Sequence, residues 1–181
     1  MTLSSRIMRN EKDTPEVVAI AARQACQAGL NVLPPREDGS KAPAGGKWKA
    51  SQHVRATESD VEEMYLVPRT GLGIVTGEVS GNVILFEFDD LQTRDNFKVR
   101  AVEFGTDALM HRIECGYSER TPGGGEHWLI RVNTVPKSQK LAVRPKADGS
   151  SKVLVETKGE GATQSSRRRT GLCTPPGRRT N

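Results

Sequence analysis

The segment from Val83 to Asp90, which reads VILFEFDD, restricts the fold of this chain more than any other. Its apolar, β-branched and aromatic residues favour a strand. Because side chains at positions i and i+2 of a strand share a face, we expect Glu87 and Asp89 to project from one surface while Phe86 and Phe88 are buried on the other. Two such carboxylates raise each other's pKa unless a cation lies between them. Oxygen ligands of this kind suit Mg²⁺ and Mn²⁺, so the segment predicts either a metal site or a solvated strand end.

The remaining patterns predict a mixture of helices and strands. Residues 14–16, Thr-Pro-Glu, have the order of an N-cap, a first-turn proline and a first-turn acid, and Gly29 ends the helix that they begin. A second helix is expected from Thr57 to near Leu66, and weaker helical character runs over 93–115. The expected buried stripe of that region consists of Val102, Leu109 and Ile113. Strands are expected at 30–33, 71–76, 82–89, 126–132 and 153–156. From periodicity alone, this mixture predicts an α/β or α+β fold.

Two further segments carry residues of the kinds that bind phosphate groups or metal ions. The stretch TPGGGEHWL begins at Thr121, and its three glycines let backbone amides approach an anion closely. His127 lies one step inside the strand that follows, where an imidazole can contact a phosphate, although a histidine after a turn is more often structural. Glu156, at the end of VLVE, offers a third carboxylate ligand for a metal, with Lys158 nearby as a phosphate contact.

The net charge of +5 comes entirely from the end of the chain. The sequence has 27 Lys and Arg against 22 Asp and Glu, yet residues 165–181 hold five arginines and no acid. We expect 162–181 to be a disordered basic tail without a strand, and 1–13 to be a disordered N-terminus. No apolar run reaches the roughly 20 residues of a membrane span, and the three cysteines give no disulfide framework. We therefore expect a cytoplasmic protein with no membrane partner.

Five segments, in this order, resemble the bifunctional DNA primase/polymerase (prim-pol) domain of the archaeo-eukaryotic primase superfamily, which occurs in phages, plasmids and integrated elements. They are the helix that ends at Gly29 before LNVLPP, the loop with Lys41, Pro43 and Trp48, and the stretches GLGIVTGEVSGNVILFEFD, ERTPGGGEHWLIRV and VLVETKGEG. The likeness covers residues 14–161. After Gly161 the family continues with an apolar strand, and the sequence here does not. We therefore expect a domain that is incomplete at its C-terminus through truncation or a frame shift.

The resemblance implies an α+β fold in which an RNA-recognition-motif (RRM)-like catalytic sheet packs with an N-terminal α/β portion. Glu87, Asp89 and Glu156 match the family's catalytic acids, which hold two Mg²⁺ or Mn²⁺ ions, although Glu-x-Asp replaces the more usual Asp-x-Asp or Asp-x-Glu. His127 matches the histidine that contacts the phosphates of the incoming nucleotide. Further nucleotide and template contacts are expected from Gly124, Gly125, Lys158, Lys41 and Lys47.

The implied activity is DNA-primase and DNA-polymerase nucleotidyl transfer in the replication of a mobile element. A 3′-hydroxyl would attack the α-phosphate of an NTP or dNTP on a single-stranded DNA template, and unwinding would need a separate helicase. Two alternatives stay open. The chain is either a non-catalytic nucleotide- or DNA-binding remnant of the same fold or, less favoured, an unrelated metal-dependent phosphodiesterase that uses the same acids.

Overall fold

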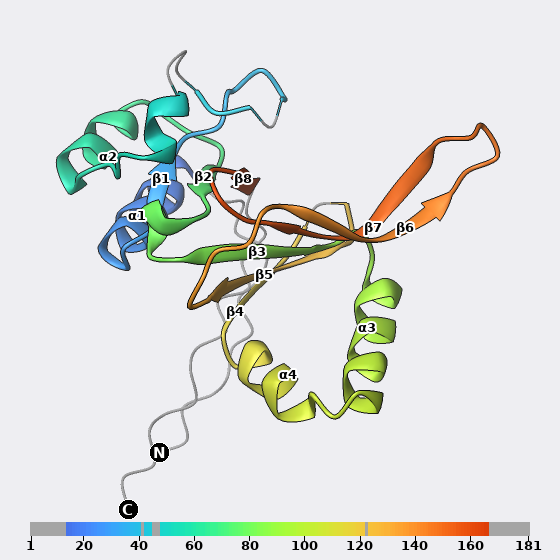
Figure 1. Ribbon diagram of the computed structural model, residues 1–181. Helices are drawn as coiled ribbons and strands as arrows, with labels where there is room; N and C mark the ends of the chain where they lie inside the picture. The colour runs from blue at the N-terminus through green and yellow to red at the C-terminus, as the bar shows by residue number, and fades with distance from the viewer. Residues whose placement is uncertain (1–13, 41, 45–47, 122, 167–181) are drawn as a thin grey trace, which may run out of the picture.

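Two antiparallel β-sheets and four α-helices make up an α+β fold in the computed structural model, which describes residues 14–40, 42–44, 48–121 and 123–166. The smaller sheet has the strand order β1-β2-β8 and the larger sheet has the order β4-β5-β3-β7-β6. Figure 1 shows the smaller sheet with α1 and α2 at one end of β3, and α3 and α4 below the larger sheet. Within these described ranges, no helix combines the length and the apolar character needed to cross a membrane.

The N-terminal portion consists of α1 (Pro15–Gln27), α2 (Glu58–Met64) and the strands β1 (Asn31–Leu33), β2 (Leu72–Val75) and β8 (Thr163–Ser166). The sequence signals for both helix starts are confirmed. The Thr14 side chain accepts a hydrogen bond from the amide of Val17, and Thr57 forms a reciprocal capping box with Asp60. One face of α1 packs with α2, β1 and β2 in a small apolar core of Val18, Ala21, Ala22, Val32, Val61, Tyr65 and Leu72.

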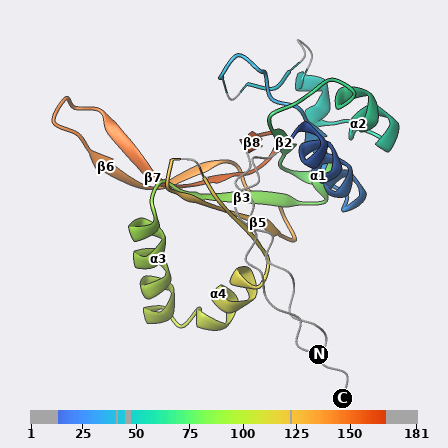
Figure 2. The same ribbon diagram turned by 180° about the vertical axis from the view of Figure 1, so that it is seen from behind.

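The larger sheet is built around β3 (Val83–Phe88), which pairs with β5 (Glu126–Arg131) on one side and β7 (Ser151–Lys158) on the other. As expected, Phe86 and Phe88 lie on one face, where their rings contact Trp128 and Phe97. The helices α3 (Leu91–Glu103) and α4 (Asp107–Glu114) lie on that same side (Figure 2). The opposite face of β3 carries the side chain of Glu87.

The helical region expected over 93–115 is two helices, and two of the three residues expected to be buried there are exposed. The third, Ile113, is half-buried and packs against the core cluster that contains Phe88 and Trp128. The chain turns at Gly105, whose φ of 70° is in the left-handed region that favours glycine. This turn ends α3, and α4 then begins with a new helical phase. A single helical repeat drawn through 93–115 therefore does not give the buried face of both helices. Val102 and Leu109 are exposed, at 59% and 52%, and Met110 is the buried residue of α4.

Three strands were absent from the sequence prediction: β4 (Tyr117–Arg120), β6 (Gln139–Pro145) and β8. The first two are edge strands of the larger sheet and carry mostly polar or exposed side chains, so they lack the apolar run that marks a central strand. β8 lies inside 162–181, where no strand was expected. Its sequence, TQSS, is polar, but its backbone pairs with β2 from Leu72 to Val75. The expectation of a strandless segment after Gly161 is therefore wrong for 163–166.

Candidate functional site

A row of four polar side chains crosses the face of the larger sheet opposite to α3 and α4. In the strand register, Glu119 of β4 lies opposite His127 of β5, His127 lies opposite Glu87 of β3, and Glu87 lies opposite Glu156 of β7. Directly opposed residues in antiparallel strands point to the same face. We call Glu119, His127, Glu87 and Glu156 the polar row. Three of its members, Glu87, His127 and Glu156, are among the residues that the family resemblance assigned to catalysis and nucleotide contact.

Lys158 joins the two acids at the β3–β7 side of the polar row. Its Nζ atom lies 2.8 Å from Oε2 of Glu87 and 2.7 Å from Oε1 of Glu156. Burial alone would lower the pKa of Lys158, but the hydrogen bonds to Glu156 and Glu87 outweigh it and raise the pKa above its ordinary value. The ammonium group therefore stays charged and occupies the space between two carboxylates, as a metal ion would.

His127 is held between two carboxylates at the other end of the row. Its Nδ1 atom lies 2.9 Å from Oε1 of Glu119, and its Nε2 atom lies 3.8 Å from Oε1 of Glu87. The side chain is only 4% exposed. Burial lowers the pKa of the imidazole, but Glu119 and Glu87 together raise it above its ordinary value. Glu119 thus fixes the ring with its other nitrogen directed along the row toward Glu87.

Glu87 is the centre of the row and is stabilised as a carboxylate. The neighbouring imidazole of His127, followed by the ammonium of Lys158, holds the pKa of the Glu87 carboxyl well below its usual range despite burial. Its Oε2 atom is buried and directed toward Lys158. A charged carboxylate kept in a partly buried, cation-lined position is the form that binds metal ions or organises a basic side chain.

Asp89 lies two residues after Glu87, just past the end of β3, and pairs with a different lysine. Its Oδ2 atom is 2.5 Å from Nζ of Lys152 on β7, and its backbone amide donates to the carbonyl of Leu154. The side chain is 36% exposed, more than that of Glu87. The expected paired acids are therefore both present on this side of the sheet. Glu87 pairs with Lys158, which the sequence analysis had placed in the site as a phosphate contact, and Asp89 pairs with Lys152, which it had not.

The glycine turn before β5 packs against the end of β3. A Cβ atom on Gly125 would lie 2.1 Å from the carbonyl oxygen of Phe88 and 2.9 Å from that of Asp89. Gly124 has a φ of 88°, in the left-handed region, and the hydroxyl of Thr121 accepts a hydrogen bond from the amide of Gly125. Close packing alone explains Gly125, and its position places the turn directly beside Asp89.

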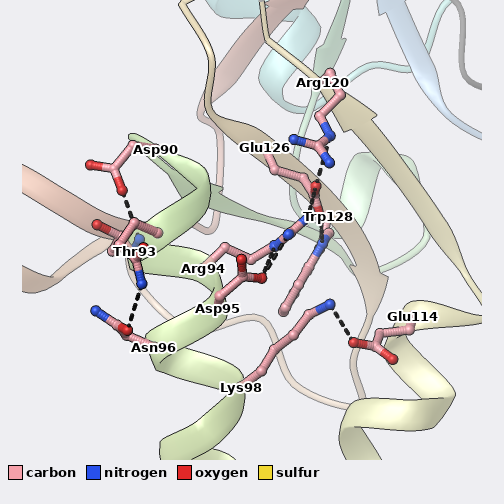
Figure 3. A network of polar contacts seen from close by, with 11 residues as sticks. Asp90, Thr93, Arg94, Asp95, Asn96, Lys98, Glu114, Arg120, Glu126 and Trp128 are labelled. Atoms are coloured by element: carbon pink, nitrogen blue, oxygen red, sulfur yellow. Dashed lines mark hydrogen bonds and ion pairs between the residues drawn. The ribbon is translucent and has the colours of Figure 1, made fainter.

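A second polar network, on the helix side of the sheet, holds this turn and α3 in place (Figure 3). The carboxylate of Glu126 accepts hydrogen bonds from Arg94 of α3 at 2.5 Å and from the indole nitrogen of Trp128 at 2.6 Å, and Arg120 lies 3.2 Å away. The side chains of Glu126 and Arg94 are 8% and 14% exposed. Sequence reasoning missed this network, although an acid one residue before the histidine of a buried strand was a usable signal.

Several expected site residues are not brought together by these contacts. Lys41 and Lys47 lie outside the described residues. Over the described ranges, no group of three or more His, Cys, Asp or Glu side chains is arranged to hold a metal ion. The residues that the sequence analysis missed are Glu119 and Lys152, both of which contact an expected site residue. Each is polar and lies on a strand whose partner could not be identified from local pattern.

No protein-family model matches this chain, and no curated protein matches it.

Proposed function

We propose that this chain is a nucleotidyl-transfer domain of the DNA primase/polymerase type, acting in the replication of a phage, plasmid or integrated element. The observation that carries the proposal is the polar row, in which Glu87, His127 and Glu156 come from three neighbouring strands and share one face. The three residues are separated by up to 69 positions in the sequence. Bringing them together requires three strands to pair in one particular register, which an incidental cluster of surface charges does not require.

The connectivity of the larger sheet supports an RRM-like catalytic sheet. β3 is followed by α3 and α4, then by β4 and β5, and later by β7. In space, β3 lies between β5 and β7, and β4 lies outside β5. An RRM sheet has this arrangement of its four strands, with the first strand between the third and the fourth. Between β5 and β7, where an RRM has its second helix, this chain has the strand β6.

The acids suit Mg²⁺ or Mn²⁺. Carboxylate oxygens are the preferred ligands of both ions, and Glu87, Asp89 and Glu156 would hold them. The donor set fits a cation, because the ammonium of Lys158 already lies within hydrogen-bond distance of Glu87 and Glu156. When bound, the ions would lower the pKa of the attacking 3′-hydroxyl and neutralise charge on the leaving pyrophosphate.

The cationic side chains of the site would bind the triphosphate of the incoming NTP or dNTP. His127, fixed by Glu119, presents its imidazole toward Glu87 and would contact a phosphate oxygen. Lys158 would leave the space between the two acids when a metal ion enters and would then pair with phosphate. The turn at Gly124 and Gly125 lies beside Asp89, where its backbone would border the nucleotide. The template would be single-stranded DNA, which a separate helicase would produce by unwinding a duplex.

Primer synthesis and extension on single-stranded DNA test the proposal, with Mg²⁺ or Mn²⁺ and NTPs or dNTPs. We expect product from the unaltered chain and none from Glu87→Gln or Asp89→Asn. Glu103→Gln is the matched control, because it removes an exposed acid of α3 on the far side of the sheet. The proposal is wrong if the two site variants make as much product as the control.

The same assay separates the two alternatives. Nucleotide binding without product favours a non-catalytic remnant of this fold. Degradation of DNA without added nucleotides, lost in Glu87→Gln, favours a metal-dependent phosphodiesterase.

A further inference from the structure

The β6–β7 hairpin extends away from the body of the molecule on the side opposite to the N-terminal portion, as Figure 1 and Figure 2 both show. Residues 137–152 contain five basic residues and one acid, whereas positions 1–164 as a whole are balanced. Every residue of this stretch is exposed except Ala142, which is half-buried. Positive charge is therefore concentrated on the part of the fold that projects furthest into solvent.

Three of these cations lie on the same face as the polar row. In the β6–β7 register, Lys140 lies opposite Glu156 and Arg144 lies opposite Lys152. Lys152 and Glu156 are four residues apart on one strand, so their side chains share a face. The hairpin thus continues the site-bearing face outward from the sheet as a line of positive side chains.

Three basic side chains of the hairpin are available to a ligand. Across the described part of the chain, Lys140, Arg144 and Lys146 form no ion pair with a carboxylate, and only Lys152 is paired, with Asp89. Two aliphatic side chains of β6, Leu141 and Val143, are 46% and 49% exposed. Val143 lies opposite Val153, on the reverse face of the ribbon from Arg144. Apolar contacts of this kind can be made with the faces of unpaired bases, which a duplex keeps stacked inside.

We propose that the β6–β7 hairpin binds single-stranded nucleic acid through its phosphates and leads the strand to the polar row. A line of cations along a narrow ribbon matches the repeating charge of one phosphate backbone. A folded acidic protein is a poorer fit, because a stable protein interface needs a broad patch with an apolar core. The delivery of the strand to the polar row rests on the proposed function, whereas binding by the hairpin does not require that the chain be catalytic.

Fluorescence anisotropy with a labelled single-stranded oligonucleotide tests this assignment on the full chain. The hairpin variant is Lys140→Gln/Arg144→Gln/Lys146→Gln. The matched control, Arg36→Gln/Lys49→Gln/Arg112→Gln, makes the same change in net charge at exposed positions off the hairpin. Because residues 165–181 add five arginines, both variants are also compared in a chain with those arginines changed to glutamine.

We expect Kd to rise roughly tenfold in the hairpin variant and to change less than threefold in the control. Single strands release about 0.7 counterion per phosphate contact, so the slope of log K against log salt should become shallower by about 2 between roughly 50 and 200 mM salt. Equal losses in the two variants would overturn the assignment. So would duplex DNA or polyglutamate that competes as well as the single strand, or the absence of binding by the unaltered chain. None of these outcomes depends on primer extension, so the two proposals fail separately.

Discussion

Replacing Glu126 with glutamine tests the energetics of the network behind the site. The substitution keeps the size of the side chain but removes the charge that Arg94 faces at 2.5 Å. Because both side chains are less than 15% exposed, solvent cannot compensate for the lost charge. Breaking a buried ion pair by removing one partner costs about 3–5 kcal/mol. Arg94 keeps a bond to Asp95 at 2.6 Å, so we expect the lower end, about 3 kcal/mol.

The control is Asp95→Asn, which removes the charge of the exposed partner of Arg94. Asp95 is 54% exposed, and an exposed ion pair contributes about 1 kcal/mol or less. Urea denaturation followed by circular dichroism measures both free energies of unfolding, and a loss of about 3 kcal/mol corresponds to a decrease of roughly 6–12 °C in Tm. The reasoning is refuted if Glu126→Gln loses less than about 1 kcal/mol, or no more than Asp95→Asn loses.

Three other substitutions have defined expectations. Gly125→Ala places a methyl group against a β3 carbonyl and should cost more than about 2 kcal/mol. Gly123→Ala is the control, because its methyl group would meet only the Thr121 hydroxyl at 3.9 Å, and it should cost about 1 kcal/mol or less; equal melting shifts would contradict this. Tyr65→Phe removes a buried hydroxyl that has no hydrogen-bond partner among the described residues, so stability should stay within about 1 kcal/mol or increase. Burial raises the pKa of Tyr65, so its contribution to stability is present below the unfolded pKa and falls above about pH 10; the phenylalanine variant should lose less stability there in denaturant titrations. Glu119→Gln removes the charge that faces Nδ1 of His127, and if the proposed function holds it should raise KM for the nucleotide roughly tenfold, whereas an unchanged KM would show that the Glu119 carboxylate does not position the ring.

Features that depend on neighbouring residues in the sequence could be predicted. The caps at Thr14 and Thr57 need only residues within one helical turn, and both formed as expected. The division of β3 into an aromatic face and an acidic face follows from a period of two, and the structure places Phe88 and Glu87 accordingly.

Features that depend on the pairing of distant strands could not be predicted. Glu119 contacts His127 only because β4 lies beside β5 in one particular register, and Lys152 reaches Asp89 only because β7 lies beside β3. Neither register is encoded in a short stretch of sequence. The error at Leu109 has a different cause, because the turn at Gly105 changed the phase of the helix that follows it.

β2 and β3 both pair with strands near the end of the described chain, and these pairings affect how the protein folds. β8 pairs with β2 in the smaller sheet and β7 pairs with β3 in the larger sheet, so β2 is matched with a strand about ninety residues later and β3 with a strand about seventy residues later. During synthesis, the larger sheet cannot be completed until β7, which ends at Lys158, has left the ribosome, and the smaller sheet must wait for β8, which ends at Ser166. Until β7 has been made, β3 lacks one neighbour, and the unpaired N–H and C=O groups of that edge are open to pairing with other chains. We therefore expect slow folding dominated by non-local contacts, with aggregation of nascent chains that stop before β7.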